Sequence, residues 1–338
     1  MYNRLILNIK PLGFTWETVD PFLFCVHHRD DYPAGNAQLG PAASLKERNL
    51  GQDFATRENW RMYHGETIPG FPAHPHRGFE TVTVVLKGLV DHSDSHGASG
   101  RYGNGDVQWM TAGAGLQHAE MFPLLNQDRP NPLELFQIWL NLPRKDKFAT
   151  PYYAMLWAED IPVYIDKDSG GRQTEITLVS GQIGDLQAPS PAPDSWAADA
   201  SNAVCIWLIR MDKNAKWKLP AASSEVNRSA YFYRGSELNV AGVSVNPYHA
   251  VDLLADEPVI FENGHTEAFI LLLQGKPINE PLSRHGPFVM NTPEEVQQAY
   301  RDFHRTHFGG WPWPMHDQVH PRDKGRFARY SDGREENR

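Results

Sequence analysis

Two pairs of side chains that can bind metals limit the fold of this 338-residue chain more than any other feature of its sequence. One stretch opens with His74 and His76 and closes with His118 and Glu120. In an extended strand, side chains two residues apart point to the same face. If the two strands lie side by side with these faces inward, three imidazoles and one carboxylate meet at one point. The pattern predicts a β-structure that holds one divalent transition metal, with positions left for water, substrate or dioxygen.

The ligand types narrow the kind of site. A closed structural zinc site usually contains Cys, whereas this set contains none. Imidazole nitrogens bind Fe, Ni, Cu, Zn and Mn, and a carboxylate adds charge and tolerates harder ions. Pro75 lies between the first two histidines and lacks a backbone donor, so its strand should lie at a sheet edge or contain a bulge.

Residues near these pairs have more than one possible role. Glu80 follows His76 by four residues, so in an unbroken strand it would share the ligand face and could support or replace a ligand. Arg77 could hold a substrate oxyanion or a carboxylate beside the metal, or it could be an ordinary surface charge. Five apolar residues could line a flat pocket or simply form the barrel core: Phe79, Trp109, Met110, Met121 and Phe136.

Composition excludes several classes of partner. The net charge of -9 argues against direct binding of nucleic acids or anionic membranes, which basic patches drive. Cys25 and Cys205 lie in apolar runs and are expected to be buried hydrophobic residues rather than a disulfide framework. The first residues lack the features of a signal peptide, and no stretch is long and apolar enough for a membrane span. The sequence therefore predicts a soluble, cytoplasmic protein.

Short β-rich runs separated by Gly and Asp turns favour a small barrel or sandwich in the first half. Similar runs return between residues 176 and 273 without another His-x-His or His-x-Glu pair, which predicts a second barrel without a metal. Near the end, Thr292 can cap a helix, Pro293 suits its first turn, and Glu295 completes a capping box. This helix should end near Thr306 and be followed by a charged tail that could be mobile.

Three segments resemble signature segments of the pirin family, a branch of the cupin superfamily: HPHRGFETVTVVL, GDVQWMTAGAGLQHAEM and GPFVMNTPEEVQQA. The resemblance implies an all-β bicupin, with two jelly-roll-like β-barrels and a C-terminal helix. In pirins a DPF segment usually lies closer to the first motif, so the polar stretch at about 29–70 is interpreted as an insertion, with a short helix and loop near the site. The predicted domains are a metal-binding barrel at 1–150, a degenerate barrel at 151–290, the helix at 291–308 and the tail at 309–338.

The resemblance also implies a metal and two contrasting functions. The metal would be Fe(II), held by the residues matching His74, His76, His118 and Glu120, although Mn, Ni, Cu or Zn could occupy the same ligands. Some pirins act as quercetin 2,3-dioxygenases, which open a flavonol-like small molecule with dioxygen and release carbon monoxide. Glu120 is then the candidate base. Other pirins are regulators that bind a protein partner and use iron as a redox switch. A different cupin reaction also remains open.

Overall fold

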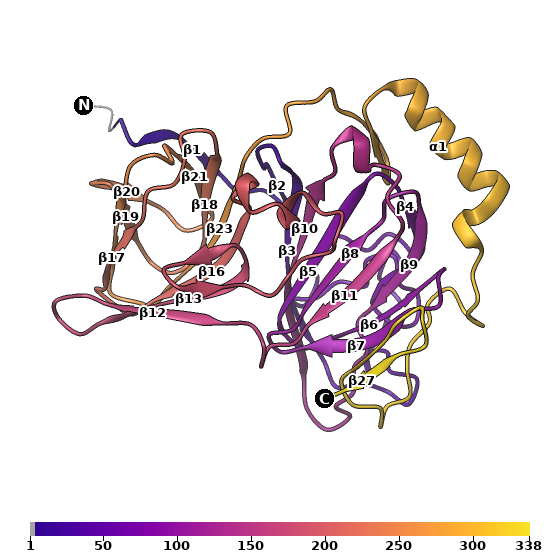
Figure 1. Cartoon of the computed structure of the whole chain (residues 1–338). Helices are drawn as coiled ribbons and strands as arrows, with labels where there is room; N and C mark the ends of the chain where they lie inside the picture. Colours follow the sequence, from indigo (N-terminus) through magenta and orange to yellow (C-terminus); the bar gives the residue numbers. More distant parts are fainter. Residues whose placement is uncertain (1–3) are drawn as a thin grey trace. The chain divides into compact units, whose positions relative to one another are not determined.

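The computed structural model describes residues 4–338, so the first three residues of the predicted N-terminal domain lie outside it. The chain forms two compact units, and Figure 1 shows the whole chain with labels on many of the strands. One unit, the second barrel, combines the N-terminal stretch ending at Cys25 with Glu159–Asn279. The other, the histidine barrel, combines Val26–Ala158 with Glu280–Arg338. This interleaved partition differs from the contiguous division expected from the sequence.

Two six-stranded sheets form the framework of the histidine barrel. One has the order β27-β26-β7-β6-β9-β4, and the other has the order β11-β8-β5-β10-β3-β2. The first sheet contains β4 (Gly70–His76), β6 (Leu89–Asp94), β7 (Ser99–Gly103), β9 (Leu116–Met121), β26 (Phe327–Arg329) and β27 (Glu335–Asn337). The second contains β2 (Thr15–Trp16), β3 (Phe22–Tyr32), β5 (Phe79–Lys87), β8 (Val107–Thr111), β10 (Asn131–Asn141) and β11 (Tyr152–Leu156). Strand β2 and the first residues of β3 come from the N-terminal stretch that ends at Cys25.

The second barrel packs a seven-stranded sheet against a four-stranded one. The larger sheet has the order β1-β21-β18-β23-β16-β13-β12 and the smaller has the order β17-β22-β19-β20. The larger sheet contains β1 (Ile6–Pro11), β12 (Val163–Lys167), β13 (Gln173–Ser180), β16 (Cys205–Met211), β18 (Asn227–Arg234), β21 (His249–Leu253) and β23 (Ala268–Gly275). The smaller contains β17 (Lys216–Leu219), β19 (Leu238–Val240), β20 (Val243–Val245) and β22 (Val259–Asn263).

Alternating burial explains why these runs form strands. In β17 the pattern is exposed, buried, exposed, buried, and the inward residues Trp217 and Leu219 join the core. Ile209 and Leu272 contribute from the opposite sheet. Both cysteines are buried and free, as predicted. Two small hairpins complete the strand set: β14 (Gln182–Ile183) with β15 (Leu186–Gln187), and β24 (Ser283–His285) with β25 (Phe288–Met290).

The C-terminal helix α1 spans Pro293–Thr306, as its capping box predicted. The Thr292 hydroxyl accepts a hydrogen bond from the Glu295 backbone, and the Glu295 side chain accepts one from the Thr292 backbone. One face packs Val296 and Ala299 against Phe288 of β25. The structure therefore confirms the all-β fold with two barrels and a C-terminal helix.

The charged segment at 309–338 is folded onto the histidine barrel, which differs from the mobile tail considered from the sequence. Strand β26 pairs with β7 and extends the sheet that carries β4 and β9. Phe327 and Ala328 are buried there. Low apolar content thus misled the prediction, because two short strands need only a few inward residues when backbone hydrogen bonds hold them to an existing sheet edge.

The insertion at about 29–70 also differs from its prediction, because it contains no helix within the described residues. Its first part continues β3 to Tyr32, and isolated bridges such as Asp53 to Tyr63 shape the remainder. Trp60, Met62 and Tyr63 bury their side chains in the core of the histidine barrel. The segment is therefore an ordered part of that unit.

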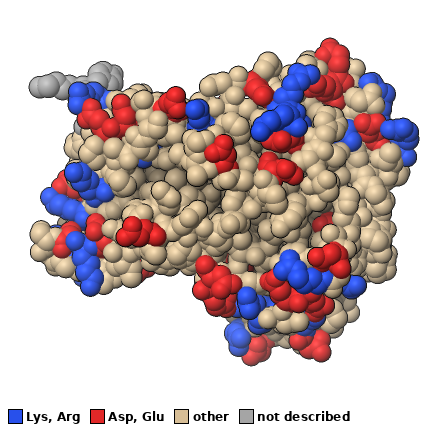
Figure 2. Space-filling model, in the orientation of Figure 1, with Lys and Arg blue, Asp and Glu red and all other residues tan. Residues whose placement is uncertain are grey.

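On the face drawn in Figure 2, Lys and Arg lie among Asp and Glu, and wide areas carry neither sign. Across the part of the chain that is described, no helix is both long and apolar enough to cross a membrane.

Candidate metal centre

Antiparallel pairing of β4 and β9 brings together three of the four residues predicted as ligands. His74 lies directly opposite His118, and His76 lies two residues along the same face. The ring centroids are 4.5 Å apart for His74 and His118, 4.8 Å for His74 and His76, and 5.0 Å for His76 and His118. One ligand atom from each ring lies within 4.8 Å of the others. Strand β4 is an edge strand with a bulge before His74, as Pro75 predicted.

Hydrogen bonds orient two of the rings. The Nδ1 atom of His74 lies 2.9 Å from the Pro72 carbonyl, and Nδ1 of His76 lies 3.4 Å from the Pro287 carbonyl. A carbonyl can only accept, so these contacts place the proton of a neutral imidazole on Nδ1 and leave the Nε2 lone pair available. This is the arrangement in which protein partners commonly orient metal-binding histidines.

Burial keeps the three rings neutral. It lowers the pKa of His74 to about 4 and the pKa values of His76 and His118 well below the usual value. His118 is fully buried, and neither of its ring nitrogens has a hydrogen-bond partner among residues 4–338. Leaving such a group unpaired is costly. Neutral, converging and partly unsatisfied imidazoles fit a divalent transition metal, so the residues present suit the cofactor expected from the sequence.

Glu120 lies beside this group and is held by neighbouring side chains. The Thr83 hydroxyl donates to Oε1 at 2.9 Å, and Nε2 of Gln137 donates to Oε2 at 2.9 Å. The Oε2 atom is 3.7 Å from Nε2 of His118. Burial raises the pKa of Glu120. The cluster of converging ligand atoms contains the three histidines without Glu120, so ligation by this carboxylate stays a prediction.

Glu80 points away from the histidines. Strand β4 ends at His76, Gly78 takes a φ of +85°, and β5 restarts at Phe79. A Cβ atom at Gly78 would lie 2.0 Å from the Val289 carbonyl oxygen, so glycine is required at this turn. Because of this turn, the side chains from His76 to Glu80 do not alternate between two faces as they would in one unbroken strand. Glu80 accepts hydrogen bonds from Trp109 at 3.2 Å and Thr111 at 2.7 Å.

Arg77 binds helix α1 rather than an anion at the histidine group. Its Nε donates to the Ala114 carbonyl at 2.7 Å, and its Nη1 donates to Asp302 at 2.9 Å. The guanidinium carbon lies 4.5 Å from the centre of the Phe308 ring. The sequence could not show this role because α1 lies more than two hundred residues along the chain.

Of the five apolar candidates, Phe79 lies at the histidine group, with its ring centroid 5.1 Å from that of His76. The others are buried elsewhere. Trp109 bonds Glu80, Met110 packs with Ala112 and Leu116, Met121 packs with Leu39 and Ile68, and Phe136 stacks on His27. These four residues are therefore packed as part of the core of the histidine barrel.

Sequence reasoning missed several neighbours of the histidines. Trp139 lies 5.4 Å from the His76 ring, and the Arg284 guanidinium carbon lies 4.7 Å from the Trp139 ring centre. Phe71 lies 6.3 Å from His74. Trp139 and Gln137 are two residues apart on β10, so strand alternation places their side chains on the same face. The run LELFQIWLNL nevertheless resembles an ordinary core strand, so the sequence did not single out Trp139.

Two β-barrels, one of which gathers three histidines on paired strands, define a bicupin with a candidate metal centre. The chain matches the Pirin family model over residues 14–140 and the Pirin C-terminal cupin domain over residues 206–309. It therefore belongs to the pirin family, as the sequence motifs predicted.

Named relatives and a solved structure support this placement. A Pseudomonas aeruginosa protein named "Putative quercetin 2,3-dioxygenase" is 36% identical, over 90% of this chain and 91% of its own length. Human Pirin is 34% identical, over 71% of this chain and 78% of its own length. A crystal structure of quercetin 2,3-dioxygenase from Acinetobacter baumannii has a TM-score of 0.70 at 26% identity, covering 90% of this chain and 98% of that chain.

Proposed function

We propose that this chain is a metal-dependent dioxygenase that cleaves flavonols such as quercetin with dioxygen, and that Fe(II) is its metal. The observation that carries the proposal is the group of three neutral imidazoles, two of them buried and that of His74 half-buried, whose ligand atoms lie within 4.8 Å of one another. The activity named for the Pseudomonas relative and for the Acinetobacter structure supports the substrate class.

The residues have distinct roles in this proposal. His74, His76 and His118 hold the metal through ring nitrogens, and Glu120 is a fourth candidate ligand. When bound, the metal supplies Lewis-acid and redox chemistry for the substrate and dioxygen. Glu120 is the candidate base for the flavonol hydroxyl proton, because its Oε2 lies 3.7 Å from His118 Nε2, beside the histidine group. Thr83 and Gln137 fix the direction of this carboxylate.

The test is quercetin turnover by protein reconstituted with Fe(II) under anaerobic conditions, followed by oxygen uptake and carbon monoxide release. We expect turnover in the natural protein and its loss in His118→Ala, with metal content reduced in parallel. His249→Ala is the matched control, because His249 lies in the second barrel and also places Nδ1 near a proline carbonyl, at 3.1 Å.

Protein that carries stoichiometric iron and turns over no flavonol would contradict the enzymatic proposal. Such a result would favour the other role implied by family resemblance, a redox-regulated module that binds a protein partner. Unchanged metal content in His118→Ala would instead contradict the ligand assignment.

A further inference from the structure

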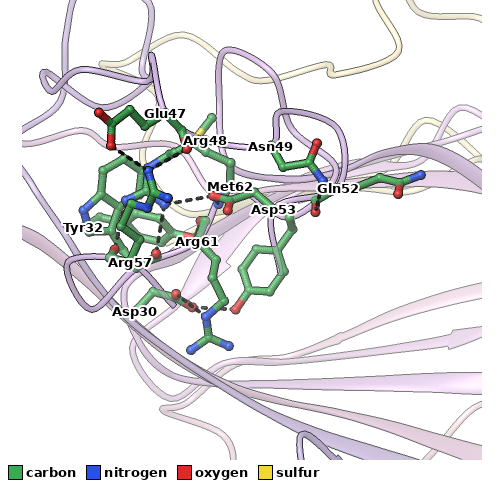
Figure 3. A network of polar contacts seen from close by, with 12 residues as sticks. Asp30, Tyr32, Glu47, Arg48, Asn49, Gln52, Asp53, Arg57, Arg61 and Met62 are labelled. Carbon is green, nitrogen blue, oxygen red and sulfur yellow. Dashed lines mark hydrogen bonds and ion pairs between the residues drawn. The ribbon is translucent and has the colours of Figure 1, made fainter. Parts of the chain in front are cut away.

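The insertion between β3 and β4 is fixed to the histidine barrel by a network of polar contacts, shown in Figure 3. Arg48 donates to Asp53 at 2.8 Å and to the Trp60 carbonyl at 3.1 Å, and its guanidinium carbon lies 3.2 Å from the Trp60 ring centre. Asp53 also accepts from the Met62 backbone at 2.9 Å. A charge pair with this much burial and hydrogen bonding holds one geometry, unlike an exposed ion pair.

Tyr63 fastens the far end of the insertion to β3. Its hydroxyl donates to Asp30 at 2.6 Å and lies 2.8 Å from Nδ1 of His28. The backbones of Asp53 and Tyr63 exchange hydrogen bonds of 2.8 and 3.0 Å. These hydrogen bonds therefore fix the backbone next to the residue that follows Asp53.

That residue is Phe54, which begins a row of aromatic rings leading to the candidate metal centre. The Phe54 centroid lies 5.0 Å from His64 and 6.4 Å from Phe71. His64 lies 5.7 Å from Phe71, and Phe71 lies 6.3 Å from His74. We call Phe54, His64 and Phe71 the aromatic wall.

The exposure of the wall distinguishes it from core. Tyr63, which contacts Phe54 at 5.7 Å, is completely buried, whereas Phe54 is 38% exposed. His64 is exposed and Phe71 is half-buried, although Nδ1 of His64 is held 2.7 Å from the Gly51 carbonyl. The Phe54 and His64 rings meet edge to face, with an interplanar angle of 75°. Aromatic rings held in place and partly open to solvent can contact a planar aromatic ligand at low entropic cost.

We infer that the insertion supplies a wall of the substrate site, and that Phe54 and His64 pack against the rings of a planar aromatic substrate whose reacting end lies at His74. This inference rests on the proposed function and deepens it, since it makes the insertion a determinant of substrate specificity. The aromatic wall binds the substrate, and the reaction takes place at the histidine group.

The test compares Phe54→Ala with Phe54→Tyr in Fe(II)-loaded protein, using quercetin as the probe. Loss of one stacked ring should raise KM about tenfold and leave kcat nearly unchanged, because the contact serves substrate and transition state equally. Phe54→Tyr keeps the ring and should restore KM. Leu50→Ala is the matched control, since Leu50 is an exposed apolar residue of the same insertion.

Quercetin binding provides a second measurement that does not depend on turnover. Quenching of tryptophan fluorescence should show weaker binding to Phe54→Ala than to the natural protein, at equal metal content. Equal KM and equal binding in the two proteins would overturn the inference, as would a loss of metal in Phe54→Ala. Natural protein that binds quercetin without turning it over would overturn the proposed function alone, and natural protein that does not bind quercetin would overturn both.

Discussion

At the scale of single residues, His118 has the surroundings that a metal would change most. Both of its buried ring nitrogens lack a hydrogen-bond partner in the described chain. A ligand that binds only the folded state stabilises it, by about 2.7 kcal/mol at a free concentration one hundred times the dissociation constant. We therefore expect anaerobic Fe(II) to raise the melting temperature of the natural protein by several degrees, and to leave His118→Ala nearly unchanged.

Scanning calorimetry with and without a chelator measures this difference. His249→Ala should respond to Fe(II) as the natural protein does, which separates loss of the site from loss of any histidine. An equal rise in melting temperature for His118→Ala and the natural protein would place the metal elsewhere.

The histidines were predictable because the spacing of two in a strand fixes the face on which a side chain lies. The position of Glu80 was not predictable, because it depends on the turn at Gly78. Glycine is required at this turn because the Val289 carbonyl, far along the chain, leaves no room for a Cβ atom. Trp139 and Arg284 were missed for a related reason. The approach of Trp139 to His76, and of Arg284 to Trp139, depends on tertiary contacts that leave no local pattern.

At the scale of elements, Arg77 attaches helix α1 to the barrel beside the candidate metal centre. Replacing it with Met keeps much of the apolar contact with Phe308 and removes the hydrogen bonds to Asp302 and Ala114. Hydrogen bonds to charged groups contribute about 1.5–3 kcal/mol each. We expect faster amide hydrogen exchange in α1, measured by mass spectrometry, while the second barrel exchanges as before.

Arg305→Met is the control, because Arg305 is an exposed partner of the same Asp302 carboxylate, at 3.0 Å. The hydrogen bond from Arg77 holds the pKa of Asp302 below its ordinary value. This contribution is therefore complete above the ordinary aspartate pKa and is lost as the pH falls through the depressed value. Exchange in α1 that is equally slow in Arg77→Met and Arg305→Met would contradict the anchoring role.

Helix α1 was predictable from the sequence, since its capping box is a local signal. Thr292 marks the start of the helix, and Glu295, three residues later, is its hydrogen-bonding partner. The insertion was not predictable. Its charged residues suggested a helix, but Arg48 and Asp53 bind each other and nearby backbone groups in a turn-rich structure. Side chains that bind the backbone in this way compete with helix formation. The insertion also lacks the helical spacing of apolar residues that would favour a helix.

At the scale of the whole molecule, each barrel is completed by a segment from the opposite end of the chain. Strand β1 pairs with β21 in the second barrel, and β26 pairs with β7 in the histidine barrel. Pairings over such distances leave no periodic signal in either segment alone. Strand patterns and motifs therefore predicted two barrels, but they could not assign the terminal segments.

One buried ion pair lies among the contacts that attach the C-terminal segment to the histidine barrel. Arg101 is 1% exposed, and it donates to both carboxylate oxygens of Asp91, at 2.7 and 2.8 Å. It also donates to the carbonyls of His320, Pro321 and Lys324, at 2.7–2.9 Å. Removing one partner leaves a buried charge and several carbonyls unpaired.

We expect Arg101→Met to destabilise the histidine barrel by about 3–5 kcal/mol, the range for breaking a buried pair. The second barrel should be unaffected. Urea unfolding with hydrogen exchange of residues 316–330 measures both effects. Arg334→Met removes an exposed pair with Glu336 on the same segment and should cost less than about 1 kcal/mol. If both variants lose equally little stability, backbone pairing of β26 with β7 alone holds the segment, and the ion pair serves another purpose.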